Sequence, residues 1–228
     1  SVYIQTYTNW EIIFWDNAST DRSSEIAKSY DNKLKYFKSV QTTILGEARA
    51  LAVEQTSGVY LAFLDCDDYW LSNKLKQQVE LFNSGLDIAV VYGRAELLYE
   101  SSGDKKIFNK GKKLKEGLIF EDLVKEDIIP FPSVLIDKEK FLDCGGFPKR
   151  FKCATDYWVL LHLARDYEFK AIQSVCCGYR IHQNNLSQSL AITSENEAIE
   201  TISLFLPNQS AALGLRHRYV NLAIIYFR

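Results

Sequence analysis

A chain of 228 residues, 47% hydrophobic and 25% charged, has the composition of a globular protein that is large enough to bury one sizeable core. Its formal net charge of -2 gives no overall attraction to nucleic acid, so no nucleic-acid partner is expected. No apolar run is long enough to span a bilayer and no signal-peptide pattern opens the sequence, and we therefore expect a cytoplasmic protein.

The first half of the chain alternates predicted strands and helices, each ended by turn or capping residues. The predicted strands are 11–15, 34–37, 59–64 and 88–92, and the predicted helices are about 22–30, 47–55 and 75–82. Such alternation predicts an α/β fold with a mostly parallel central sheet flanked by helices.

The second half is less regular. Residues 100–115 are rich in Lys and contain Gly, which is typical of a solvated loop, hairpin or flap. We then expect strands at 133–136 and 179–182, helices at 138–142 and from Asp156, and one or two helices from Glu195 onward. The predicted division is a domain over 1–189 and a helical tail over 190–228, whose leucines pack in the core or, alternatively, dock on a partner or a membrane surface.

The cysteine and methionine contents limit which kinds of site and which gene product the sequence can represent. Five cysteines without paired ligand spacing indicate neither a disulfide framework nor a zinc site, so reduced thiols are expected. No methionine occurs, even at position 1, and we expect the sequence to be part of a longer gene product.

The most informative stretch is the apolar run from Val59 to Leu64, which ends in Asp65, Asp67 and Asp68. In parallel sheets, ligands bind beyond the carboxyl ends of the strands. Clustered carboxylates repel one another unless a cation lies between them, and a hard divalent ion with oxygen ligands meets that need. The stretch therefore predicts a metal, and with it a phosphate-bearing substrate.

Other enzyme classes share this acidic pattern. A haloacid-dehalogenase-type phosphatase would carry Thr or Val where Tyr69 stands, together with a second strand that ends in paired acids. A P-loop enzyme needs a Gly-rich loop that ends in Gly-Lys-Ser or Gly-Lys-Thr, which the sequence lacks. The neighbouring motifs disfavour both classes.

Several further motifs occur in a fixed order along the chain. They are Gln5–Ile13, Asp16–Asp21, Leu64–Asp68, Gly145–Phe147, Thr155–Trp158 and Tyr179–His182. Together they resemble the family 2 glycosyltransferases with the GT-A fold, up to about Ser189. The resemblance implies an inverting transfer of a sugar from a nucleoside-diphosphate donor, most commonly a UDP-sugar, with Mn²⁺ or Mg²⁺ as the cofactor.

The resemblance also implies roles for individual residues on the donor side. Asp16 matches the acid that contacts the nucleobase, although a turn or N-cap aspartate would look the same. Asp65 matches the acid near the ribose, and Asp67 matches the acid that binds the metal. Arg49 falls where the family commonly has Arg, but Ala50 replaces the Asn that usually follows, so an ordinary helix-face charge is the alternative.

On the acceptor side, Asp156 matches the catalytic base, which removes the proton of the attacking hydroxyl. Thr155 stands where the family often has Glu. His182 aligns with a histidine that completes the metal shell or touches the diphosphate in some members, while a purely structural His is the alternative.

Family members begin with a strand that would precede Ser1, and we expect this strand to lie inside the sheet. The leading hypothesis is transfer to a glycan or lipid-linked glycan, by a protein that associates peripherally with the inner face of the cell membrane. A non-catalytic nucleotide-sugar or glycan-binding module is the alternative.

Overall fold

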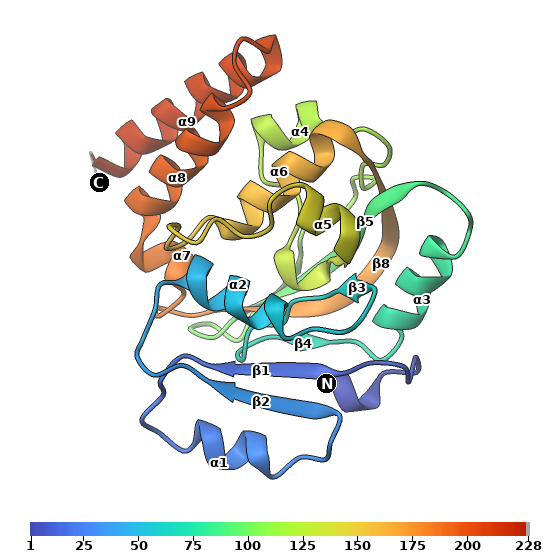
Figure 1. Ribbon diagram of the computed structural model, residues 1–228. Helices are drawn as coiled ribbons and strands as arrows, with labels where there is room; N and C mark the ends of the chain where they lie inside the picture. Colours follow the sequence, from blue (N-terminus) through green and yellow to red (C-terminus); the bar gives the residue numbers. More distant parts are fainter. Residues whose placement is uncertain (227–228) are drawn as a thin grey trace.

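The computed structural model describes residues 1–226 and has an α/β architecture with two sheets (Figure 1). The smaller sheet pairs β1 (Ile12–Asp16) with β2 (Leu34–Lys38) in parallel, with Ile12 opposite Leu34. Helix α1 (Ser23–Lys28) connects the two strands and packs on them, as expected for a crossover between parallel strands.

The larger sheet has the strand order β3-β7-β5-β8-β4, and β6 pairs with the far half of β5. Its strands are β3 (Tyr60–Leu61), β4 (Tyr69–Trp70), β5 (Ile88–Tyr99), β6 (Lys105–Ile107), β7 (Leu135–Asp137) and β8 (Glu168–Ile181). Strands β5 and β8 run side by side along nearly their whole length and form the centre of this sheet.

The predicted α/β class is confirmed, but the strand directions are more mixed than predicted. The pairs β1–β2 and β5–β8 are parallel, whereas β3–β7, β5–β7, β4–β8 and β5–β6 are antiparallel. A short connection can only join antiparallel neighbours, and the five residues between β5 and β6 turn the chain back on itself in this way. The segment 100–115 thus contains a short hairpin strand.

The remaining helices cover the larger sheet and extend beyond it (Figure 1). They are α2 (Leu45–Glu54), α3 (Lys74–Phe82), α4 (Phe120–Lys125), α5 (Lys138–Asp143), α6 (Thr155–Asp166), α7 (Leu186–Ser189), α8 (Ala191–Ser203) and α9 (Gln209–Tyr226), with 3-10 turns η1 (Val2–Ile4) and η2 (Phe131–Ser133). No helix within residues 1–226 is both long and apolar enough to cross a membrane.

The main core lies between the central strands and α6. Val90, Phe169 and Leu160 are almost completely buried there. Residues of α8 and α9, Ala198 and Ala211 among them, belong to the same core, so the C-terminal helices pack on the domain. The backbones of α9 and α4 come close together at Gly214. A Cβ atom at this position would lie only 2.4 Å from the Val124 carbonyl oxygen.

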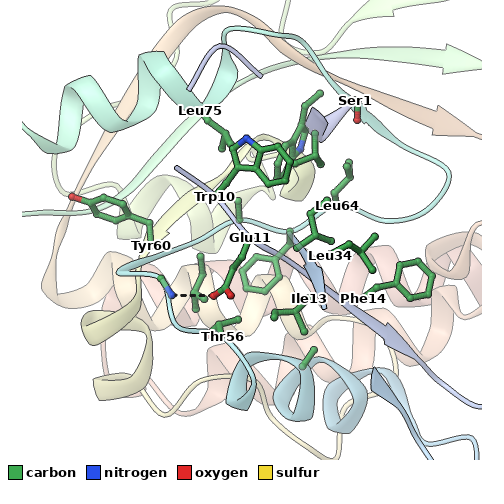
Figure 2. A pocket seen from close by; sticks show the side chains of 18 of the residues that line it. Ser1, Trp10, Glu11, Ile13, Phe14, Leu34, Thr56, Tyr60, Leu64 and Leu75 are labelled. Carbon is green, nitrogen blue, oxygen red and sulfur yellow. Dashed lines mark hydrogen bonds between the residues drawn. The ribbon is translucent and has the colours of Figure 1, made fainter. Parts of the chain in front are cut away.

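A cavity of about 840 Å³ separates the two sheets (Figure 2). Its wall is mostly apolar and includes Trp10, Ile13, Leu64 and Leu75. Within residues 1–226, β1 pairs only with β2 and β3 pairs only with β7, so no strand bridges this gap. Hydrogen bonds join the two sides of the cavity at one edge. There, Glu11 Oε1 accepts from the Ser57 backbone nitrogen at 2.6 Å and from the Ser57 hydroxyl at 2.8 Å.

Candidate active site

The acidic segment forms a turn just beyond the short strand β3. The Asp68 amide donates to the Asp65 carbonyl oxygen at 3.1 Å, which closes the turn. The Asp65 side chain is 54% exposed and that of Asp67 is 39% exposed, so both carboxylates remain accessible to a ligand. This accessibility is what a binding role requires of them.

Arg49, on α2, joins this turn to the start of α6. One guanidinium nitrogen, Nη2, lies 3.2 Å from Asp65 Oδ1, and the other, Nη1, donates to Thr155 Oγ1 at 2.9 Å. The guanidinium also stacks over the ring of Phe131, at 4.9 Å from its centroid. Arg49 is therefore held between the acidic turn and α6, and its role in donor binding stays a prediction.

His182, just after β8, meets the acidic turn from the other side. Its Nε2 lies 2.8 Å from Asp67 Oδ2. Beside this pair, the Arg180 amide donates to Asp68 Oδ1 at 2.9 Å, while Asp68 Oδ2 is buried without a hydrogen-bond partner. Burial raises the pKa of Asp68 to about 7, and the negative charges of Asp67 and Asp65 add to the effect.

These residues fit a metal ion only in part. Among the described residues, no group of three or more His, Cys, Asp or Glu side chains is arranged to enclose an ion. Asp67 and His182 lie close together and could offer one oxygen and one nitrogen ligand. Such a pair suits an ion that takes its other ligands from substrate phosphates and water, as Mg²⁺ commonly does.

Asp156 lies in the first turn of α6, where its Oδ1 accepts from the Tyr157 amide at 2.9 Å. Burial raises the pKa of Asp156, while the positive charge of Arg49 opposes this shift. Asp127 is an exposed residue that feels the charge of Asp156. The protein atoms around Asp127 and the charge of Asp156 raise its pKa to about 7.

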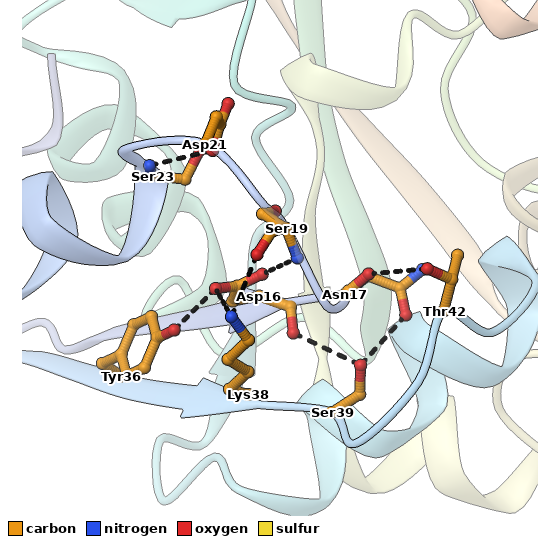
Figure 3. A network of polar contacts seen from close by, with 9 residues as sticks. All are labelled: Asp16, Asn17, Ser19, Asp21, Ser23, Tyr36, Lys38, Ser39 and Thr42. Atoms are coloured by element: carbon orange, nitrogen blue, oxygen red, sulfur yellow. Dashed lines mark hydrogen bonds and ion pairs between the residues drawn. The ribbon is translucent and has the colours of Figure 1, made fainter.

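Asp16 is placed differently, in a network of its own at the end of β1 (Figure 3). The Tyr36 hydroxyl donates to Asp16 Oδ2 at 2.6 Å, the Ser19 amide donates to Oδ1 at 2.6 Å, and Lys38 Nζ lies 3.7 Å from Oδ2. Burial alone would raise the pKa of Asp16, but these hydrogen bonds outweigh it and hold the pKa at about 2. The Asp16 side chain has no exposed surface. Its carboxylate is thus fully used within the protein, which fits the turn-aspartate alternative, and contact with a nucleobase stays a prediction.

The structure therefore brings five of the predicted site residues into one neighbourhood and leaves Asp16 outside it. The five are Arg49, Asp65, Asp67, Asp156 and His182. Sequence reasoning missed Asp127 and the acceptor role of Asp68 for the Arg180 amide. It had no signal for either, since both depend on which loops face each other across the crevice.

The sequence of the chain is similar to those of known proteins. The family model described as "Glycosyl transferase family 2" matches residues 1–141. The chain is 29% identical over 192 residues to the "UDP-Glc:alpha-D-GlcNAc-diphosphoundecaprenol beta-1,3-glucosyltransferase WfgD" of Escherichia coli, and the match covers 83% of this chain and 72% of that protein.

Solved structures match nearly the whole chain. S. aureus TarS 1-349 in complex with UDP has a TM-score of 0.65 at 18% identity, over 99% of this chain and 64% of that one. The mannosyltransferase PcManGT from Pyrobaculum calidifontis, in complex with GDP-Man and Mn2+, has a TM-score of 0.68 at 14% identity, over 99% of this chain and 69% of that one. At these identities the likeness establishes the fold, and the predicted GT-A class is confirmed.

Proposed function

The chain belongs to glycosyl transferase family 2, and we propose that it is an inverting enzyme that transfers a sugar from a UDP-sugar to a glycan or lipid-linked glycan. The observation that carries the proposal is the bridge formed by Arg49. It joins Asp65 of the acidic turn to Thr155, the neighbour of Asp156. This bridge supports a site in which the acidic turn would bind a metal-diphosphate donor beside a carboxylate that would act as the base.

Two relatives support the choice of substrates. The name of WfgD describes a UDP-Glc donor and a diphosphoundecaprenol-linked acceptor, and TarS has been solved in complex with UDP. We extend these substrate classes to this chain as part of the proposal. An acceptor with an undecaprenol tail is held in a membrane, so the proposal also places the enzyme at the cytoplasmic face of the cell membrane as a peripheral protein.

On the donor side, Asp67 and His182 would hold a divalent ion together with the diphosphate, and Asp65 would contact the ribose. A bound Mn²⁺ or Mg²⁺ would offset the negative charge that develops on the departing diphosphate. Asp16 would support the donor site through its contacts with Ser19, Tyr36 and Lys38, which hold the loop after β1.

On the acceptor side, Asp156 removes the proton from the attacking hydroxyl while that oxygen approaches the anomeric carbon opposite the diphosphate. A base works best when its pKa lies near the working pH, and burial shifts the pKa of Asp156 upward in that direction. The positive charge of Arg49 opposes the rise in the pKa of Asp156, because it favours the ionised form.

The test is calorimetric titration of the protein with UDP in the presence of Mn²⁺, followed by turnover measurements with a panel of UDP-sugars. We expect UDP to bind only with the metal, Asp67→Asn to abolish that binding, and Asp104→Asn, which changes a carboxylate on the exposed turn between β5 and β6, to leave it intact. Metal-independent binding or an unaffected Asp67→Asn variant would contradict the donor site. Binding without turnover across the panel would favour the non-catalytic module.

A further inference from the structure

The loop that leads into α6 is held by a carboxylate from the C-terminal helices. Glu197 on α8 accepts hydrogen bonds from three consecutive backbone amides, at 2.6 Å from Lys152, 3.0 Å from Cys153 and 2.8 Å from Ala154. Ala154 is the N-cap residue of α6, and its own side chain cannot cap the helix. Glu197 therefore supplies, from 43 residues away along the chain, the acceptor for the N-cap amide that a Glu at the third helical position provides in a capping box.

Glu197 is itself fixed in place. Only 8% of its surface is exposed, and the Thr201 hydroxyl donates to its carbonyl oxygen at 2.7 Å within α8. Hydrogen bonds from amides to a carboxylate are among the stronger ones in proteins, and three of them act here on one short segment. The position of residues 152–154 is thus determined by α8.

A second contact from the same region fixes the other side of this turn. Arg218 on α9 lies over the ring of Tyr157, with its Cζ 4.6 Å from the centroid, and pairs with Glu195 at 3.2 Å. The Tyr157 hydroxyl in turn donates to the Leu123 carbonyl oxygen at 2.9 Å. Asp156 therefore sits between a segment held by α8 and a ring held by α9.

We propose that Glu197 is a positioning residue for the catalytic base, acting through the backbone of residues 152–154 to set the place of Asp156 in the crevice. This inference rests on the proposed function, since it assigns Glu197 to the same reaction. It follows that the enzyme cannot be divided near residue 189 without loss of turnover.

The physical reason lies in how little displacement a base tolerates. A shift of about 1 Å in a reacting group can cost on the order of 10²-fold in rate. Without the Glu197 carboxylate, three amides lose their acceptor and the loop before α6 must move to find new partners. The donor contacts at Asp67 and His182 come from other elements, and they should be unaffected.

The experiment compares Glu197→Gln with Glu200→Gln in the full chain. Glu200 lies on the same helix, but it is exposed and pairs with Arg150, so its variant is the matched control. We expect Glu197→Gln to lower kcat by about 10- to 100-fold while the UDP dissociation constant and the donor KM stay within about twofold. Hydrogen exchange should also become faster at residues 152–157, and the control should match the parent in every measurement.

If Glu197→Gln fails to fold, Glu197→Asp provides the second variant, because it keeps the charge and shortens its reach. We expect a smaller loss of kcat, again with UDP affinity retained. A folded variant of either kind whose kcat equals that of the parent would overturn the inference while leaving the proposed function intact. A parent protein that binds UDP and turns over no donor would instead overturn both.

Discussion

Arg49 and Thr155 lie 106 residues apart in the chain and are joined by a hydrogen bond of 2.9 Å between the guanidinium Nη1 and the threonine hydroxyl. Because the other guanidinium nitrogen pairs with Asp65, this one side chain sets the spacing between the acidic turn and the first turn of α6. The family often has Glu at the position of Thr155, so the contact is made here by a neutral partner.

Replacement of Arg49 by Lys should lower kcat by about 10- to 100-fold, because an ammonium group cannot reach Asp65 and Thr155 together. The control is Arg22→Lys, which changes an exposed ion pair with Glu25 on α1. Steady-state kinetics with a UDP-sugar and its acceptor would measure both. Equal kcat values for Arg49→Lys and the parent would show that the bridge does not position the site.

Replacement of Asp156 by Asn should reduce transfer by about 10²- to 10⁴-fold, since the amide cannot accept the proton of the attacking hydroxyl. UDP affinity should change little, because the donor contacts lie elsewhere. Asp166→Asn is the matched control, as Asp166 lies at the opposite end of the same helix and pairs only with its neighbour Arg165. Retained turnover in Asp156→Asn would reject the base assignment.

The pH dependence should reflect the pair formed by Asp156 and Arg49. A base must be ionised, so the rate falls as the pH drops through the raised pKa of Asp156. The positive charge of Arg49 opposes this rise, because it favours the ionised carboxylate. In Arg49→Gln this charge is gone, and we expect the acid limb of the kcat profile to move to higher pH. An unchanged or downward-shifted limb would contradict this coupling.

Replacement of His182 by Ala should weaken Mn²⁺-dependent UDP binding by about 10-fold or more, because Asp67 loses the partner that lies 2.8 Å away. His217→Ala, on the exposed side of α9, is the control and should bind UDP as the parent does. Calorimetry with and without EDTA would measure the metal dependence. Unaltered metal-dependent affinity in His182→Ala would assign this histidine a structural role.

Replacement of Asp16 by Asn should act on stability, because Tyr36 and Ser19 both donate to the buried carboxylate. We expect a loss of about 1–3 kcal/mol at neutral pH. The pKa of Asp16 falls from 3.8 in the unfolded chain to about 2 in the folded one, so its contribution is present above about pH 4 and is lost as the pH falls towards 2. Thermal unfolding at pH 7 and pH 3 would show a smaller difference between the two proteins at pH 3; an equal difference would contradict the assigned pKa.

The local parts of this site could be predicted from the sequence, because each motif carries its own pattern. The apolar run that ends in Asp65 and Asp67, and the helical spacing of apolar residues after Asp156, follow from hydrophobicity alone. The long-range contacts could not be predicted from local patterns. The pairing of His182 with Asp67 spans 115 residues and nothing in either segment specifies the other, although the resemblance to the family implied that both lie at the metal.

Strand lengths show the same limit. The stretch 59–64 was predicted as a strand, yet only Tyr60 and Leu61 pair, because a strand needs a partner with free backbone groups and the cavity side of β3 offers none. Conversely, β8 begins at Glu168, well before the predicted start at residue 179, because β5 provides a partner along its full length. In both cases the length of the strand was set by the backbone partner available to it.

The cavity between the two sheets also affects which part of the protein unfolds locally before the core. The unit formed by β1, β2 and α1 faces an apolar space of about 840 Å³ and lacks strand pairing to the larger sheet. Segments with few buried contacts across a boundary open at a lower free-energy cost than the core does. For residues 1–228 taken alone, the amides of β1 and β2 should therefore exchange with solvent earlier than those of β5 and β8, and the Asp16 network would loosen on heating before the core does.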